Sequence, residues 1–207
     1  MESKIEVIKQ WLGAGSINIF GLPMSGKDTQ GIKLAETLGA KFLSSGIIIR
    51  AMEAKTNKSY TASGALTPTD VFYEWVLPYF ERPELFRTPL ILSSIGRWSG
   101  EENQVMSVAA GAGHPIMAAI ILDLSETDIN ERFTKSKELN DRGNRSDDQT
   151  PAIFQNRIKE FREKTIPVIQ HYNELGLLIR VRGDQPRDAV FNEIIAKLYE
   201  KALQTHS

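Results

Sequence analysis

The fold of this chain is decided by the stretch Gly21-Leu22-Pro23-Met24-Ser25-Gly26-Lys27-Asp28-Thr29. The stretch follows a short apolar run at residues 17–20 and opens into a helix-like segment at residues 30–38. A strand, a glycine loop and a helix in this order can cradle phosphate, because the loop N–H groups and the helix N-terminus point at one anion. The two glycines permit the tight turn, and Lys27 supplies a mobile cation for the outer phosphates.

The loop departs by one residue from the phosphate-binding pattern GxxxxGK followed by Ser or Thr. Asp28 follows Lys27 directly, and the hydroxyl comes one position later, at Thr29. A glycine turn with a chance lysine is the alternative reading. The flanking strand and helix favour the phosphate cradle over that alternative.

The bulk composition restricts the class of protein. A length of 207 residues suits one domain with a sizeable core. Because 25 basic residues meet 26 acidic ones, a general nucleic-acid binder is disfavoured. The chain has no cysteine, which excludes disulfides and thiol catalysis, and its three histidines make no metal pattern. No run suits a signal peptide or a membrane span, so we expect a cytoplasmic monomer that binds neither membrane nor nucleic acid.

Apolar runs alternate with amphipathic segments along the whole chain. Strands are predicted at residues 17–20, 40–46, 89–94, 115–124 and 177–181. Helices are predicted at residues 1–15, 30–38, from 47, 70–80, 102–112, 127–137, 150–174 and 187–204, the long one open to a break near Pro167. Thr67 or Thr69 is the expected N-cap of helix 70–80. This alternation predicts an α/β three-layer sandwich with a parallel sheet of about five strands and helices on both faces.

Arginines follow several of the predicted strands. Because ligands of open α/β sheets bind outside the carboxyl ends of the strands, these cations are expected to face the phosphate cradle. Arginine binds phosphate oxygens bidentately and stays charged, so the set suits two phosphorylated ligands. For any single arginine, a solvated surface charge is the alternative. The set comprises Arg50, Arg97, Arg132, Arg142, Arg145 and Arg157.

From about residue 17 to residue 198, the ordered motifs resemble those of nucleoside monophosphate kinases of the adenylate kinase type, in the short-lid form. Residues 21–30 are similar to the family's GxPGxGKGTQ, and residues 45–50 to its TGDMLR. Residues 64–70 are similar to its GxLVPD segment with one extra residue, and residues 92–97 to its LDGFPR. Residues 145–148 resemble its RxDD, and residues 165–172 resemble a following T-x-P stretch that ends in tyrosine.

The resemblance implies reversible phosphoryl transfer from ATP, with Mg²⁺, to a nucleoside monophosphate, by default AMP. It implies a core at residues 1–46, 81–131 and 149–207, an acceptor-binding flap at 47–80 and a short lid at 132–148. The implied catalytic residues are Lys27, Arg97, Arg132, Arg145 and Arg157. The implied ATP-binding residues are Gly21, Pro23, Met24, Ser25, Gly26, Lys27, Asp28, Thr29, Arg132 and Gln185. The implied acceptor-binding residues are Ser45, Gly46, Ile49, Arg50, Ser94, Arg97 and Glu101.

The chain departs from the family pattern at its magnesium carboxylates. Ser93 stands at the aspartate of LDGFPR, and Ile47 stands at the aspartate of TGDMLR. Asp28 instead replaces a family glycine beside the phosphates. We hypothesise that Asp28 takes over part of the magnesium role through the metal's water shell. The alternative is that Asp28 caps the helix that follows the loop.

Base recognition and the lid also depart from the family. The family's adenine-reading glutamine falls on Glu101, and a pocket glycine falls on Ser94. Because a carboxylate only accepts hydrogen bonds, GMP or CMP stays open beside AMP. Glu101 or Glu102 can instead be a solvated first-turn residue. A lid arginine falls on Ser136, where Lys135, Lys137 or Arg142 could substitute. Two further alternatives stay open: a kinase for another small acceptor, and a nucleotide-binding regulatory protein that has lost catalysis.

Overall fold

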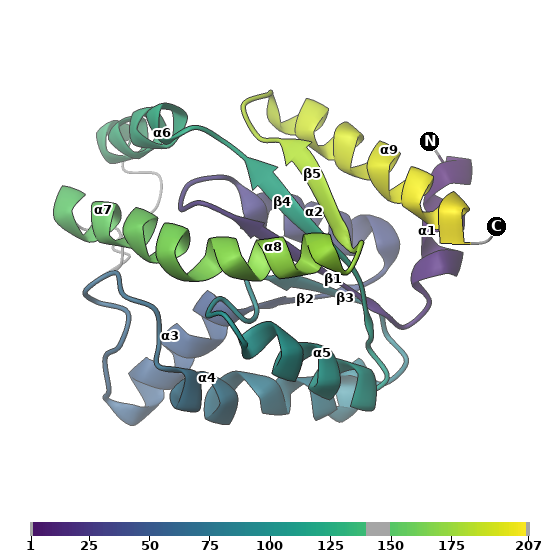
Figure 1. Cartoon of the computed structure of the whole chain (residues 1–207), viewed down its shortest axis with the longest axis horizontal. Coiled ribbons are helices and arrows are strands. Elements are labelled where there is room, and N and C mark those ends of the chain that lie inside the picture. Colours follow the sequence, from purple (N-terminus) through teal and green to yellow (C-terminus); the bar gives the residue numbers. More distant parts are fainter. Residues whose placement is uncertain (1, 140–149, 206–207) are drawn as a thin grey trace.

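The computed structural model of the chain describes residues 2–139 and 150–205, which build one five-stranded parallel sheet with helices on both faces (Figure 1). The order β2-β3-β1-β4-β5 places the strand before the glycine loop at the centre. The predicted fold class is confirmed. The strands are β1 (Ser16–Gly21), β2 (Lys41–Ser44), β3 (Leu90–Ser93), β4 (Ile116–Asp123) and β5 (Leu178–Arg182). The α-helices in the described residues are α1 (Glu2–Leu12), α2 (Lys27–Leu38), α3 (Ser45–Thr56), α4 (Thr69–Val76), α5 (Glu101–Gly111), α6 (Glu126–Leu139), α7 (Pro151–Glu160), α8 (Ile166–Glu174) and α9 (Arg187–Thr205).

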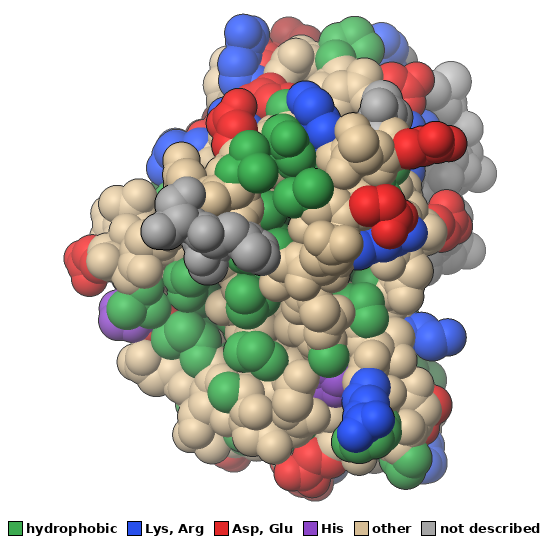
Figure 2. Space-filling model, turned by 90° about the vertical axis from the view of Figure 1, so that its right-hand side faces the viewer, with side chains coloured by type: hydrophobic (Ala, Val, Ile, Leu, Met, Phe, Trp, Pro, Cys, Tyr) green, Lys and Arg blue, Asp and Glu red, His purple; other side chains and the backbone are tan. Residues whose placement is uncertain are grey.

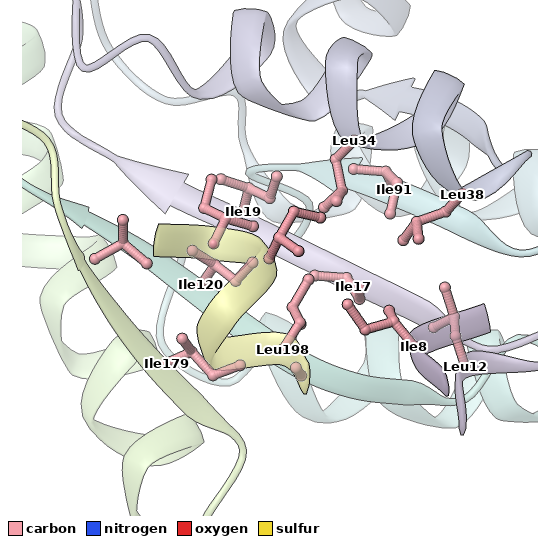
Figure 3. Packing of buried hydrophobic residues seen from close by; sticks show 14 of the residues in the cluster. Ile8, Leu12, Ile17, Ile19, Leu34, Leu38, Ile91, Ile120, Ile179 and Leu198 are labelled. Carbon is pink, nitrogen blue, oxygen red and sulfur yellow. The ribbon is translucent and has the colours of Figure 1, made fainter. Parts of the chain in front are cut away.

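Two hydrophobic clusters hold the helices on the sheet. Side chains alternate between the faces of a strand, so Ile17 and Ile19 of β1 pack against α1, α2 and α9. Figure 3 shows this cluster, with Ile17 close to Leu198 of α9 and Ile8 of α1. On the opposite face, Phe20 of β1 packs with residues of α3, α4, α5 and α8. Fully burying one such side chain stabilises the fold by about 1.5–3 kcal/mol.

The carboxyl ends of the parallel strands meet at one edge, beside the glycine loop. Asn18, fully buried in β1, fixes the chain that leaves β3 there: its Nδ2 donates to the Ile95 carbonyl at 2.7 Å. Ser94, just after β3, has a φ of +52°, a left-handed conformation that suits glycine better. The family that the chain resembles carries a glycine at this position, the residue type that adopts a left-handed conformation most readily. This bend also leads the chain toward Arg97.

Two predictions for helix 70–80 were wrong, its N-cap and its end. The residue that caps α4 is Pro68, not a threonine, and it offers no side-chain cap. The helix ends at Val76 and continues as a 3₁₀ turn, Leu77–Glu81, since Pro78 lacks an N–H donor. The long helix expected at 150–174 has the break that the sequence left open near Pro167: a π-helical turn at Phe161–Thr165 separates α7 from α8. Such wide turns are frequent at functional sites.

The expected flap and the first part of the expected lid consist largely of helices. The expected flap, residues 47–80, comprises most of α3, a connecting loop, α4 and part of the 3₁₀ turn. The first part of the expected lid, residues 132–139, belongs to α6, and residues 140–148 lie outside the described residues. Among residues 2–139 and 150–205, no helix combines the length and the apolar character needed to cross a membrane.

Figure 2 shows the face of the molecule at the amino ends of the strands, away from the glycine loop. Lys, Arg, Asp and Glu side chains are intermixed on this face, with hydrophobic side chains between them. The loop edge of the sheet differs, because several cations gather there around one hollow.

Candidate active site

The phosphate cradle is a tight loop between β1 and α2. A Cβ atom at Gly21 would lie 2.4 Å from the Ser25 Oγ, so a side chain at Gly21 would clash. Gly26 has a φ of +86° and precedes the first residue of α2, Lys27. Met24 adopts a φ of +67°, which is rare outside glycine. The loop therefore wraps its backbone around one point, as anion binding at a helix N-terminus requires.

The loop forms the wall between two hollows. One hollow, here named the acceptor hollow because the residues predicted to bind the acceptor line it, opens to solvent and is lined on this side by Gly21, Pro23, Lys27 and Asp28. The other hollow is named the donor hollow because Arg132 and Gln185, predicted to bind ATP, line it. Its loop residues are Met24, Ser25, Gly26 and Thr29. All the loop residues that the sequence assigns to ATP binding thus line one hollow or the other, on the two sides of Lys27.

The acceptor hollow concentrates positive charge. Four cationic side chains line it: Lys27 from α2, Arg50 from α3, Arg97 after β3 and Arg157 from α7. Asp28 is the one carboxylate among the described lining residues. Six of the seven residues predicted to bind the acceptor line this hollow, namely Ser45, Gly46, Ile49, Arg50, Ser94 and Arg97. A set of guanidinium groups facing one loop is suited to holding phosphate oxygens.

The seventh predicted residue, Glu101, lies in a smaller recess beside the acceptor hollow. The recess has room for about one water molecule and shares five lining residues with the hollow: Ser45, Ile49, Leu66, Ser94 and Arg97. Within the described chain, the Thr67 Oγ1 and the Trp98 Nε1 that border it are buried and have no hydrogen-bond partner. A recess with polar groups left over can hydrogen-bond a ligand.

The idea that Glu101 or Glu102 is solvated was wrong, because both side chains are at least 96% buried, with exposures of 3% and 4%. The Glu101 Oε2 accepts from the backbone N–H groups of Arg97 (2.8 Å) and Trp98 (3.0 Å), and its Oε1 accepts from the Thr69 Oγ1 at 2.8 Å. Burial raises the pKa of the Glu101 carboxyl, and these hydrogen bonds offset the rise in part. Glu101 thus ties the start of α5 to the start of α4.

Asp28 and Ser93 are in direct contact within the lining of the acceptor hollow. The Ser93 Oγ, at the end of β3, donates a 2.5 Å hydrogen bond to the Asp28 Oδ1 in the first turn of α2. Ile47, at the other position where the family carries an aspartate, leaves its side chain 50% exposed. The chain therefore supplies one carboxylate and one hydroxyl, side by side, at the edge of the phosphate cradle.

The donor hollow brings together Arg132 of α6 and Gln185, which follows β5. The Arg132 Nη2 donates to the Gly183 carbonyl at 2.7 Å, and its Nη1 reaches the Met24 carbonyl at 3.3 Å. These two bonds lay the guanidinium group against the loop. Lys135 and Ser136 line the same hollow, whereas the side chain of Lys137, Arg142 and the predicted catalytic Arg145 lie outside the described residues.

One contact of the flap was not predicted from the sequence. The backbone N–H of Leu66 donates to the Glu160 Oε2 at 2.9 Å, and the Asn156 Nδ2 donates to the Ser63 carbonyl at 3.0 Å. At Gly64, a Cβ atom would lie 2.5 Å from the Ile153 carbonyl oxygen. The flap loop therefore rests on α7, the helix that carries Arg157. The glycine of the GxLVPD-like segment was the only sequence signal for so close an approach.

A phosphate-binding loop at the end of a central parallel strand, with cations on the neighbouring strand ends, defines a P-loop kinase. The chain is similar over most of its length to gluconokinase from Sinorhizobium meliloti 1021, with a TM-score of 0.62, 20% identity, and coverage of 93% of this chain and 95% of that one. At that identity the likeness shows the shared fold.

Sequence comparison identifies the family. The chain is 31% identical over 183 residues to adenylate kinase from Methylobacterium nodulans, covering 84% of this chain and 91% of that protein. It is 29% identical over 194 residues to adenylate kinase from Thermus thermophilus (90% and 99% covered) and 28% identical over 207 residues to that from Chlamydia pneumoniae (88% and 96%). No family model matches. The chain belongs to the adenylate kinase family, and it is a nucleotide-binding phosphotransferase of the P-loop type.

Proposed function

We propose that the protein transfers the terminal phosphoryl group of ATP, reversibly, to a nucleoside monophosphate, with AMP as the acceptor. The observation that carries this proposal is that the phosphate loop lines two hollows, in one of which Lys27 lies with three arginines. A kinase that transfers a phosphoryl group between two bound phosphorylated ligands needs this arrangement. Its main tasks are to align the ligands and to stabilise the charge of the transition state. The relatives named adenylate kinase support AMP as the acceptor.

Each cation has a definite task in this proposal. Arg50 and Arg97 grip the acceptor phosphate from the strand-end side of the hollow. Lys27 holds the donor phosphates and follows the transferred group as it passes between the hollows. Arg157 stabilises the charge on that group from α7. The resemblance implies the same role for Arg145, which lies outside the described residues. Arg132 and Gln185 flank the nucleoside of ATP in the donor hollow. The electrostatic effect of such donors is large because the closed site excludes water.

Magnesium fits the residues that are present. Mg²⁺ prefers oxygen ligands, keeps several waters, and binds through one or two carboxylates together with substrate phosphates. The Asp28 carboxylate borders the acceptor hollow next to Lys27 and offers such an oxygen donor. When bound with ATP, the ion would neutralise charge on the phosphate oxygens during transfer. Asp28 would contact the water shell of the ion.

The acceptor base would lie in the acceptor hollow, with one edge against the recess beside Glu101. The unpartnered Thr67 hydroxyl and Trp98 indole N–H, both buried there, are free to bond a base edge. Glu101 replaces the glutamine with which the family reads adenine, and a carboxylate can accept from an amino group of adenine, cytosine or guanine. CMP and GMP therefore form the second candidate class of acceptor, favoured by the identity of this one residue.

A coupled assay with ATP, magnesium and one acceptor at a time tests the proposal. AMP, GMP, CMP, UMP and dTMP are compared at equal concentration by the specificity constant kcat/KM, with Lys27→Ala as the inactive reference. We expect AMP to give the highest value. A higher value for CMP or GMP would reassign the acceptor. Tight nucleotide binding without turnover on any of the five would overturn the proposal and favour a regulatory role.

A further inference from the structure

Proteins with a P-loop hold magnesium through two side chains from two elements. In GTPases and ATPases with a P-loop, a Ser or Thr hydroxyl directly follows the lysine and an aspartate comes from the end of a neighbouring strand, whereas the adenylate kinase family carries a glycine directly after the lysine. In this chain both positions are occupied, but by the opposite residue types. Asp28 directly follows Lys27, and Ser93 is the last residue of β3, the strand that pairs with β1.

The two side chains meet in space. The Ser93 Oγ lies 2.5 Å from the Asp28 Oδ1, so the hydroxyl donates to the carboxylate. Ser93 is 1% exposed, which fixes its position in the sheet, whereas Asp28 is half-buried and faces the acceptor hollow.

Asp28 is the one acidic side chain that the described hollow offers to the ion of Mg–ATP. The described lining of the acceptor hollow holds four basic side chains and no carboxylate other than Asp28. The remaining family position for a magnesium carboxylate is filled by Ile47, which is half-exposed and lacks an oxygen. Any protein carboxylate in the described hollow that contacts the ion of Mg–ATP must therefore come from Asp28.

We propose that the hydroxyl and the carboxylate of the magnesium site have exchanged elements in this chain. Asp28 on the P-loop helix contacts the water shell of the ion in Mg–ATP, and Ser93 on β3 is the positioning residue that orients the carboxylate. The proposal rests on the proposed function, in that it needs ATP in the donor hollow. It goes beyond that function because it assigns the metal to a residue pair that departs from the family pattern.

A reciprocal exchange of the two side chains tests the pairing. Mn²⁺ replaces Mg²⁺ as the probe, and its affinity for the protein with ATP, in the absence of an acceptor, is measured by electron paramagnetic resonance. Asp28→Ser should weaken Mn²⁺ binding about 10- to 100-fold, the usual effect of removing an outer-shell partner. Asp28→Ser combined with Ser93→Asp should recover most of the affinity, because it restores the arrangement typical of P-loop proteins.

The chain offers a matched control at another helix. The Ser125 Oγ donates to the Asp128 Oδ2, also at 2.5 Å, in the first turn of α6. Asp128→Ser removes a carboxylate from an equivalent serine contact, and it should leave Mn²⁺ affinity unchanged. Thermal unfolding of every variant shows whether a loss of affinity comes from a loss of folded protein.

The outcomes separate this proposal from the proposed function. Unchanged Mn²⁺ affinity in Asp28→Ser would overturn the exchange. The exchange would also be overturned if Asp28→Ser loses Mn²⁺ affinity and the folded double variant does not recover it. In that case Asp28 acts as a counter-ion of the cations around it. If the wild-type protein binds no Mn²⁺ with ATP while it still transfers phosphate with magnesium, the exchange fails and the function stands. Absence of ATP binding itself would contradict the function.

Discussion

The backbone N–H of Leu66 in the flap donates a 2.9 Å hydrogen bond to the carboxylate of Glu160 in α7, a residue 94 positions further along the chain. The same Oε2 accepts from Lys164 Nζ at 2.5 Å, and that ammonium group lies 3.9 Å from the centre of the Trp98 ring. One buried carboxylate therefore joins the flap, the helix that carries Arg157, and the recess assigned to the acceptor base.

Removal of this carboxylate should loosen the acceptor side of the site. Glu160→Ala leaves the buried Leu66 N–H without a partner, which costs about 1–3 kcal/mol of unfolding free energy. We expect a higher acceptor KM with a nearly unchanged KM for ATP, and partial rescue in Glu160→Gln, whose amide oxygen still accepts. Glu163→Ala is the control, because Glu163 makes an exposed ion pair at 4.0 Å with Lys159. Equal effects on both substrates would argue against a flap-specific role.

Replacing Arg97 by lysine should separate the shape of the cation from its charge. Arginine presents a planar fork that binds phosphate bidentately, whereas lysine is a point charge. Loss of one such charge-assisted bond, about 1.5–3 kcal/mol, predicts an acceptor KM about 10- to 100-fold higher for Arg97→Lys. Arg82→Lys, at an exposed ion pair with Glu84, should leave all constants unchanged. Initial rates at varied AMP and ATP check this, and an effect confined to ATP would contradict the assignment of Arg97 to the acceptor.

Met24 should stabilise the fold despite its backbone strain. It replaces a glycine of the family loop at a φ of +67°, and its side chain packs with Ile129 and Phe133 of α6 and Phe154 and Ile158 of α7. Met24→Gly relieves about 1 kcal/mol of strain but removes a buried side chain worth about 2–5 kcal/mol.

The net loss of unfolding free energy in Met24→Gly should therefore be about 1–4 kcal/mol, measured by urea denaturation. Met24→Leu, which keeps the volume, serves as the comparison and should change the stability by less than about 1.5 kcal/mol. A glycine variant more stable than the wild type would show that strain outweighs packing at this loop.

The buried Glu101 should leave a pH signature in the unfolding free energy. Burial raises the pKa of its carboxyl above the ordinary value of 4.5, in spite of the Trp98, Thr69 and Arg97 contacts. Between that value and the raised one, the folded chain binds more protons than the unfolded chain. The contribution of Glu101 to stability therefore falls as the pH rises through this window.

Glu101→Gln lacks this titration, so its stability relative to the wild type should increase as the pH rises above the ordinary carboxyl pKa of 4.5, measured in urea unfolding series. The glutamine also restores the adenine reader of the family, so the preference for AMP over CMP and GMP should rise in the same variant. A stability difference that does not change with pH would show that Glu101 titrates alike in the folded and unfolded chains.

Local patterns predicted the parts of this protein that depend on local physics. The loop from Gly21 to Thr29, the alternation of strands and helices, and the strand-end arginines could all be recognised from short stretches. Contacts between distant segments could not. Leu66 and Glu160 are 94 residues apart, and neither residue carries a signal of the other. The hydrogen bonds that hold Glu101 likewise come from the chain around Arg97 and from Thr69, and they became visible only when α4 and α5 were placed side by side.

The departures from the family pattern show the same limit. In the sequence, Ser93 is the loss of a family carboxylate and Asp28 is the gain of one, 65 residues apart, with no sign that the two are related. Their hydrogen bond makes them one pair. Met24 looked like an ordinary loop residue, although its φ and its contacts with α6 and α7 identify it as a packing residue.

The most direct test of a two-nucleotide site is the binding of a single inhibitor that joins ATP to AMP through a chain of phosphates. Isothermal titration of the protein with this compound, in magnesium, is repeated with saturating ATP and then with saturating AMP. We expect one molecule to bind per chain, each nucleotide to weaken its binding, and Arg97→Lys to abolish the competition with AMP while sparing that with ATP. Competition with ATP alone in the wild-type protein would contradict a nucleoside monophosphate kinase.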